Sequence, residues 1–251
     1  TPDAFSFTDV TNAALSTTQT SNLITISGIN ASTAVSVSGG TYSKNGGAYT
    51  STAGTCVNGD TFRVRHTSSA SFSTATNTTL TVGGVSDTYT STTLAEDTTP
   101  TQFTFNDVTG ASRNTVYTSN TITIAGMNST AAVSVTGGTY SKNGGAFVST
   151  AGTAVNGDTF AVRMTSSTTF SSAKGCKLTV GGTNDTYTVT TEAADSTPDS
   201  FTFTDVSNAS LSTVYESNTI TVAGLNTSAS VSITGGTFSK NGGAWTSTGT
   251  T

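Results

Sequence analysis

A long internal repeat is the feature that most constrains what this chain can fold into. Thr-Pro pairs begin at residues 1, 99 and 197, so the period is 98 residues. The motif GGTYSKNGGA at 39–48 returns at 137–146 and, with one Tyr-to-Phe change, at 235–244. We therefore predict domains at 1–98 and 99–196, and the N-terminal half of a third domain at 197–251.

Each unit has the sequence pattern of short strands. Apolar residues alternate with polar ones in five short runs, which contain Phe5 and Phe7, Ile24 and Ile26, Val35 and Val37, Phe62 and Val64, and Leu80 and Val82. The chain has 60 Thr and 36 Ser, and β-branched Thr suits a solvated sheet face. About seven strands per unit and no helix predict an all-β chain of tandem immunoglobulin-like β-sandwiches.

One hairpin is predicted within each unit. Asn45-Gly46 lies between Tyr42 and Tyr49, and both central residues of a type I′ turn need positive φ, which Asn and Gly tolerate. We expect the two tyrosines to pair across this turn.

Composition excludes several classes of function. Apolar residues make up 33% of the chain, but only 9% are charged, which is the opposite of the charge-rich signature of disorder. A net charge of -5 with nine scattered basic residues excludes a nucleic-acid partner. No apolar run is long enough to span a bilayer, so no membrane insertion is expected within this chain.

The linkers and the third copy set the expected architecture. Linkers at 94–100 and 192–198 are short and carry one proline each, which predicts semi-rigid spacing and an elongated rod. The third copy has the first four predicted strands but lacks counterparts of residues 57–89. Half a sandwich has no closed core, so this copy is either truncated, with a remainder elsewhere, or completed by strands from another chain.

The repeated motifs resemble a known group of domains. The linker Asp-Thr-Thr-Pro, the hairpin Tyr-Ser-Lys-Asn-Gly-Gly-Ala-Tyr, the strand Asn-Gly-Asp-Thr-Phe-x-Val-Arg and the closing Leu-Thr-Val-Gly-Gly carry the resemblance. They are similar to tandem bacterial immunoglobulin-like or fibronectin-III-like repeats of surface proteins, adhesins and phage structural proteins. The resemblance implies the sandwich fold but no single function.

Catalytic chemistry is not expected. His66 is the single histidine, and it falls on the same strand face as Phe62 and Val64. Its counterpart in the second copy is Met164, so we interpret it as a packing residue. No nucleophile and base recur together, which predicts a protein that is not an enzyme and needs no cofactor.

Repeated carboxylates are the candidate metal ligands. Calcium takes six to eight oxygens and rigidifies the linkers of many tandem surface domains. The best candidates lie at the linkers: Glu96, Asp97 and Asp107, with Asp195 and Asp205 in the next copy. The alternative is that these residues cap loops and turns.

The two cysteines occupy positions that do not match between copies. Cys56 aligns with Ala154, and Cys176 aligns with Thr78. They are therefore either unpaired thiols or the ends of an intermolecular disulfide between neighbouring chains.

The hairpin tip is the candidate contact surface, because the repeat displays it in every unit. The residues are Lys44, Asn45 and Gly46, then Lys142, Asn143 and Gly144, then Lys240, Asn241 and Gly242. The alternative role is turn chemistry, with lysine discouraging edge pairing. The aromatic residues that follow, Tyr49, Phe147 and Trp245, form either a sugar-binding face or part of the core.

These observations favour a non-enzymatic extracellular structural or adhesive repeat protein at the cell surface: a stalk, an adhesin segment or a fibre subunit. Its partners would be other copies of itself, surface proteins or glycans, bound through many weak contacts. One alternative is a phage virion tail or capsid decoration protein, with virion proteins as partners. Another is a carbohydrate-binding accessory array of a secreted enzyme.

Overall fold

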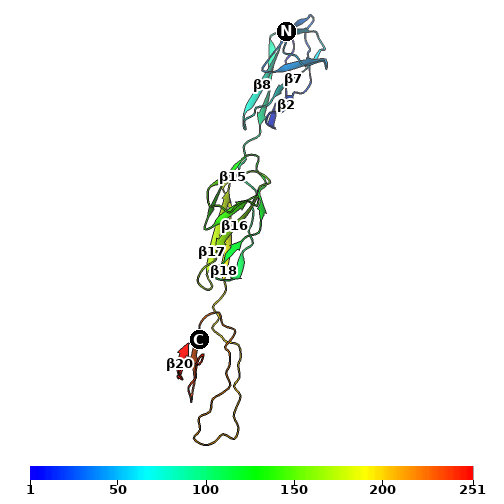
Figure 1. The fold of residues 1–251 in the computed structure, drawn as a ribbon. Helices are drawn as coiled ribbons and strands as arrows, with labels where there is room; N and C mark the ends of the chain where they lie inside the picture. Colours follow the sequence, from blue (N-terminus) through cyan, green and yellow to red (C-terminus); the bar gives the residue numbers. More distant parts are fainter. Residues whose placement is uncertain (251) are drawn as a thin grey trace. The chain divides into compact units, whose positions relative to one another are not determined.

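The computed structural model describes residues 1–250, and this part of the chain consists of strands, turns and loops without a helix (Figure 1). The chain divides into two compact units, Thr1–Thr98 and Thr99–Thr251. Within residues 1–250, no helix has the length and apolar character needed to cross a bilayer.

The first repeat is a two-layer sandwich of nine short strands. One sheet has the order β1-β9-β8-β4-β6, and in the other β7 pairs with β2, β3 and β5. The strands are β1 (Val10–Ala13), β2 (Thr18–Thr20), β3 (Ile24–Thr25), β4 (Thr33–Ser38), β5 (Thr41–Lys44), β6 (Gly54–Cys56), β7 (Thr61–Thr67), β8 (Ala75–Val82) and β9 (Val85–Thr93).

The second repeat has the same topology in the same register. Its sheets are β10-β18-β17-β13-β15, and β16 paired with β11, β12 and β14. The pair Val35↔Val82 in the first repeat returns as Val133↔Val180. The strands are β10 (Val108–Ala111), β11 (Val116–Thr118), β12 (Ile122–Thr123), β13 (Ala131–Thr136), β14 (Thr139–Lys142), β15 (Gly152–Ala154), β16 (Thr159–Thr165), β17 (Ala173–Val180) and β18 (Thr183–Thr191).

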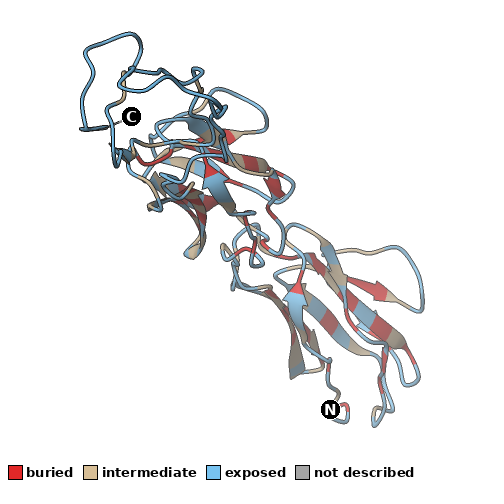
Figure 2. Cartoon of the chain, turned by 90° about the horizontal axis from the view of Figure 1, so that it is seen from below, coloured by how far each residue is buried: buried red, intermediate tan, exposed pale blue. Residues whose placement is uncertain are grey.

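Each of these repeats has its own core between its two sheets. The predicted core residues Phe62, Val64, Leu80 and Val82 are fully buried, as are their counterparts in the second repeat. Buried and exposed residues alternate along the strands (Figure 2), as the sequence alternation predicts. The all-β fold of tandem immunoglobulin-like sandwiches is thus confirmed.

Two local expectations in the first repeat are wrong. The segment around Phe5 and Phe7 is not a strand; the Phe7 amide donates a hydrogen bond to the Asp87 carboxylate at 2.6 Å. Side-chain acceptors therefore replace the ladder of a neighbouring strand at this edge. Across the hairpin, Tyr42 pairs with Thr50 rather than with Tyr49.

The third repeat contains two described strands, β19 (Ser230–Ser232) and β20 (Thr248–Thr250), rather than the four predicted. The topology of the first repeat explains the difference. There β1 pairs with β9, and β2, β3 and β5 pair with β7, so these strands all need the second half of a sandwich. The β4–β6 pair alone lies within the first half, and β19 with β20 is its counterpart.

The register of this pair also locates a deletion. Val231 pairs with Gly249 just as Val35 pairs with Gly54 in the first repeat. The third repeat is therefore one residue shorter before β20. Its aromatic and aliphatic side chains are largely exposed, including Phe201, Phe203 and Leu211.

Candidate functional site

The repeated hairpin is fastened to a buried aspartate. In the first repeat, Lys44 Nζ lies 2.7 Å from Asp60 Oδ2 and donates to the Thr55 carbonyl. Asn45 Nδ2 donates to Asp60 Oδ1 at 2.7 Å, and the Val57 amide donates to Asp60 Oδ2 at 2.8 Å. Hydrogen bonding from Lys44, then from Asn45 and Val57, lowers the pKa of Asp60 to about 2. This carboxylate is therefore ionised at neutral pH.

The second repeat reproduces this arrangement. Lys142 Nζ lies 2.8 Å from Asp158 Oδ2, and Asn143 donates to Asp158 Oδ1 at 2.8 Å. Burial alone would raise the pKa of Asp158, but hydrogen bonds from Lys142, Asn143 and the Val155 amide lower it. The same polar cluster thus connects the hairpin to the Asn-Gly-Asp turn in both repeats.

This geometry shows what the hairpin tip can offer to a partner. Asn45 and Gly46 have φ of 50° and 74°, so the predicted type I′ turn is confirmed. The lysine and asparagine side chains make hydrogen bonds within the domain, and they remain partly or fully exposed beside the glycine backbone of the turn. Contact with a partner through this loop stays a prediction.

A buried polar cluster surrounds His66 on β7. Its Nδ1 lies 2.8 Å from Thr78 Oγ1, and its Nε2 lies 2.7 Å from Ser91 Oγ. The imidazole also packs on the Tyr89 ring, with centroids 5.1 Å apart. Burial lowers the pKa of His66. Ser91 is fully buried, whereas His66 is 7% exposed and lines a pocket of the first repeat.

The second repeat has an apolar version of this cluster. Met164 replaces His66, and Cys176 replaces Thr78 beside Tyr187, as the strand register shows. Val189 takes the place of Ser91. All three replacements are buried. The interpretation of His66 as a core residue is confirmed, although the hydroxyls that satisfy it were not foreseen.

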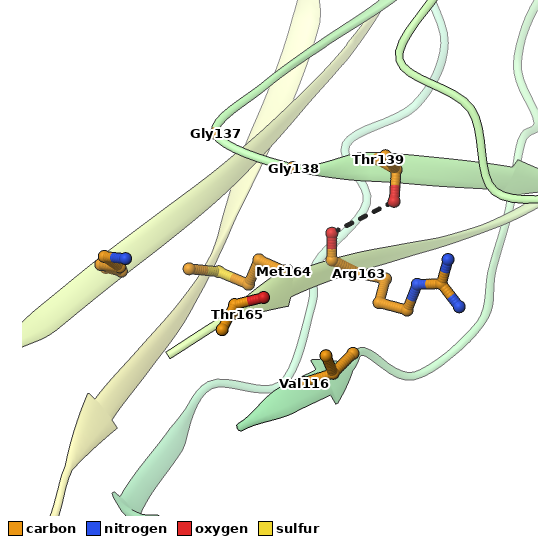
Figure 3. A pocket seen from close by; sticks show the side chains of 8 residues that line it. Val116, Gly137, Gly138, Thr139, Arg163, Met164 and Thr165 are labelled. Atoms are coloured by element: carbon orange, nitrogen blue, oxygen red, sulfur yellow. Dashed lines mark hydrogen bonds between the residues drawn. The ribbon is translucent and has the colours of Figure 1, made fainter. Parts of the chain in front are cut away.

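A pocket lies beside this position in both repeats. Its volume is about 640 Å³ in the second repeat and about 450 Å³ in the first. In the second repeat, Met164 and Arg163 point in opposite directions from β16 (Figure 3). Neither pocket is lined by a carboxylate. Each residue that lines the pocket of the second repeat lies 98 positions after one that lines the pocket of the first repeat. The residues in the second repeat are Val116, Gly137, Gly138, Thr139, Arg163, Met164, Thr165 and Lys174.

In the first two repeats, an arginine covers one face of the aromatic residue that follows the hairpin. The Arg65 guanidinium lies 3.9 Å from the centre of the Tyr49 ring, and Arg163 lies 4.1 Å from that of Phe147. One face of each ring is therefore occupied within the domain. This packing favours the structural interpretation of Tyr49 and Phe147 over a sugar-binding face, whereas Trp245 in the third repeat is 53% exposed.

Both cysteines are free and buried. Burial raises the pKa of Cys56, and it raises the pKa of Cys176 to about 11. Neither thiol is accessible to a neighbouring chain while its domain is folded. The intermolecular disulfide stays a prediction that this placement does not favour.

Two of the candidate calcium ligands, Asp107 and Asp195, each accept a hydrogen bond from a backbone amide. Asp107 Oδ1 accepts a hydrogen bond from the Thr188 amide at 2.7 Å, and Asp195 Oδ1 accepts one from the Thr197 amide at 2.9 Å. Within residues 1–250, no three His, Cys, Asp or Glu side chains gather in a way that could hold a metal ion. Calcium binding at Glu96, Asp97, Asp107, Asp195 and Asp205 therefore stays a prediction.

An asparagine holds the second linker. Asn226 Oδ1 accepts from the Asp195 amide at 2.7 Å, and Asn226 Nδ2 donates to the Ala193 carbonyl at 2.9 Å. The Asn226 amide also donates to the Asp195 carbonyl at 3.1 Å. These bonds fasten the linker to the third repeat.

Sequence reasoning missed the partners of these groups. Asp60 lies in an Asn-Gly-Asp turn, and this local sequence does not reveal that Asp60 anchors, through Asn45, a hairpin 15 positions earlier. The signal available was the joint recurrence of Lys-Asn-Gly and Asn-Gly-Asp at a constant spacing. For Ser91, the signal was its simultaneous change with His66 and Thr78 between copies.

Comparison with known proteins does not assign this chain to a family. No family model matches the sequence, and no curated protein matches it. Solved structures with similar folds include the titin Z1Z2 domains in complex with telethonin (13% identity, 77% of this chain and 95% of that chain, TM-score 0.39). Others are the I9–I11 tandem of titin (16%, 75% and 66%, 0.24) and the Yersinia pseudotuberculosis adhesin InvE (11%, 73% and 56%, 0.25). Likenesses at this level concern the fold alone.

Proposed function

We propose that this chain is a non-enzymatic structural and adhesive repeat protein that acts outside the cell as a stalk, adhesin segment or fibre subunit. The observation that carries this proposal is the recurrence of one complete sandwich in two copies with the same register and the same fastened hairpin. Repetition of a whole domain with its surface loop multiplies identical contacts, and multivalent contacts raise avidity without any strong single site.

The features that recur in the first two repeats support a mechanical role. The Lys–Asp–Asn cluster, the separate cores of the two repeats and the cation–π pairs all stabilise the domains. The hydroxyl-rich, weakly charged surface offers hydrogen bonds but little electrostatic attraction for nucleic acid.

Short linkers would set the spacing of the domains. Asn226 fastens residues 193–195 to the third repeat, which restricts rotation at that linker. We expect successive domains to form an extended array, and small-angle scattering of the purified chain tests this expectation. A compact particle with a radius of gyration close to that of a globular protein of this length would contradict it.

The location and role are tested by immunogold labelling of unpermeabilised cells that produce the protein. Antibodies against the first repeat should label the cell surface or filaments that project from it. Label confined to virions would support the virion alternative, and label confined to permeabilised cells would refute an extracellular role.

A further inference from the structure

Lys174 occupies an unusual place in the second sandwich, because it continues the row of core residues along β17. Cys176 and Leu178 of this row are fully buried, and Lys174 lies two positions before Cys176 on the same side of the sheet. Lys174 is also directly opposite Val189 of β18, another fully buried residue. Because β17 begins only one residue earlier, Lys174 lies at the open end of the core, where it is exposed.

The charge of Lys174 is not neutralised within the domain. Lys142 forms an ion pair with Asp158, whereas Lys174 forms none with any residue among 1–250. Lys174 and Arg163 both line the pocket of the second repeat, which no carboxylate lines. The ammonium group is therefore free to pair with an anion from outside the domain.

The other side chains of this pocket provide hydroxyl groups and apolar surface. Thr139 and Thr165 contribute the hydroxyls, and Met164 and the exposed Val116 contribute aliphatic groups. The volume of about 640 Å³ lies within the range of about 300–1,000 Å³ that is usual for small-ligand pockets. The pocket thus combines a cation, hydroxyls and an apolar surface.

Gly138 leaves one wall of the pocket without a side chain (Figure 3). A Cβ at this position would lie 2.5 Å from the Arg163 carbonyl oxygen and 2.6 Å from Cys176 Sγ. The carbonyl belongs to the backbone of β16 and cannot move aside, so no larger residue fits here. The fold itself therefore keeps this wall open.

The pocket of the first repeat is a comparison within the same chain. Five of its lining residues are identical to their counterparts, while Thr18, His66 and Thr76 take the places of Val116, Met164 and Lys174. The arginine is among the identical residues, and burial lowers the pKa of His66, which leaves the imidazole uncharged at neutral pH. The charge of Lys174 is therefore what distinguishes the two pockets electrostatically.

We propose that the pocket of the second repeat binds an acidic sugar, and that Lys174 pairs with the carboxylate or sulfate group of this sugar. Sugar hydroxyls match the hydroxyls of Thr139 and Thr165, and the C–H groups of a sugar ring match the apolar surface of Val116 and Met164. An ion pair at an exposed lysine is weak, so a single pocket binds weakly and discriminates by charge.

The test is a titration of the intact, isotope-labelled chain, with amide chemical shifts read by NMR. The acidic probes are tetragalacturonate, which carries carboxylates, and a heparin-derived tetrasaccharide, which carries sulfates. The methyl ester of tetragalacturonate is the uncharged control. At least one acidic probe, and not the ester, should shift the amides of Gly137, Gly138 and Lys174, and leave those of Gly39 and Gly40 in the first repeat unchanged. Added salt should weaken this binding.

Two variants on β17 separate the site from general attraction by positive charge. Lys174→Thr introduces the residue that the first repeat has here, Thr76, and it should weaken binding about fivefold because the partner of the anion is lost. Lys177→Thr is the matched control: Lys177 is also exposed but lies on the other face of the strand, so its loss removes the same charge and should leave the affinity unchanged.

Several results would overturn the proposal. They are the absence of shifts with both acidic probes, equal shifts in the two repeats, equal binding of the methyl ester, and equal weakening by the two variants. Equal shifts from inorganic sulfate at the same concentration would show a site for a bare anion rather than for a sugar. The spectrum of Lys174→Thr reports whether the second repeat is folded; if it is not, the comparison of the two repeats in the unmodified chain decides.

The proposal rests on the adhesive role proposed above for its purpose but not for its test. Immunogold labelling decides where the protein is located, whereas the titrations decide whether the pocket binds an acidic sugar. A failure of one is therefore distinguishable from a failure of the other.

Discussion

The first two repeats share strand order, register and hairpin cluster, but they fill the same place in the core with different chemistry. The first places His66 between the hydroxyls of Thr78 and Ser91, and the second places a thioether, a thiol and an isopropyl group there. A buried polar group is tolerated when its partners change with it. The comparison therefore teaches that these three positions behave as one unit.

Breaking this unit in the first repeat should have the largest effect. His66→Met leaves the buried Ser91 hydroxyl without its partner, while Thr78 keeps the Gly39 carbonyl at 3.2 Å. We expect the free energy of unfolding of the first repeat to fall by about 2 kcal/mol. Hydrogen exchange measured on peptides from each repeat would report this loss separately from the second repeat.

The control is the triple variant His66→Met, Thr78→Cys, Ser91→Val, which transplants the second repeat's cluster. It should restore stability to within about 1 kcal/mol, because the exchanged volume and polarity are then matched. A single variant as stable as the triple one would show that the three positions act independently.

The next effect is a response to acid in one repeat alone. Burial lowers the pKa of His66 in the folded state below the unfolded value of about 6.5. The unfolded chain therefore binds a proton first as pH falls, so the stabilising contribution is complete above about pH 6.5 and is lost below it. Below about pH 6.5, the first repeat should lose stability by up to about 1.4 kcal/mol per pH unit, until the pH reaches the lowered pKa of folded His66.

The second repeat has no histidine and should not change over this range. In stronger acid, below about pH 3.8, both repeats should lose stability, because hydrogen bonds lower the pKa of Asp60 to about 2 and also lower the pKa of Asp158. Amide hydrogen exchange, corrected for its intrinsic pH dependence, measures the stability of each repeat in both pH ranges. Equal acid sensitivity of the two repeats between neutral and mildly acidic pH would contradict the assignment to His66.

These differences show what the sequence could predict and what it could not. Alternation at Phe62, Val64, Leu80 and Val82 predicted the core correctly, because period-two burial is a local property of a strand. The alternation at Phe5 and Phe7 has the same form, yet no strand forms there. Whether an alternating segment finds a ladder partner depends on residues about 80 positions away, such as Asp87, and local pattern carries no information about them.

The candidate sites were predictable to a similar extent. The hairpin turn followed from Asn45 and Gly46 alone, since their tolerance of positive φ is intrinsic. The role of Asp60 depends on the folding of β7 beside β5, so it could not be derived from the Asn-Gly-Asp turn that contains it. The third repeat shows the same limit, because most of its predicted strands have their pairing partners in the other half of a sandwich.

The smallest effect concerns one hydroxyl in each core. Tyr187 donates to the Thr118 carbonyl at 3.4 Å, whereas the Tyr89 hydroxyl is buried without a hydrogen-bond partner among the described residues. Tyr187→Phe should therefore cost the second repeat about 0.5 kcal/mol. Tyr89→Phe removes an unsatisfied polar atom and should leave the first repeat unchanged or slightly more stable, since an unpaired buried hydroxyl is itself unfavourable. Denaturant unfolding, followed by hydrogen exchange in each repeat, compares the stability changes of the two variants. A larger loss of stability from Tyr89→Phe than from Tyr187→Phe would mean that the Tyr89 hydroxyl does have a hydrogen-bond partner in solution.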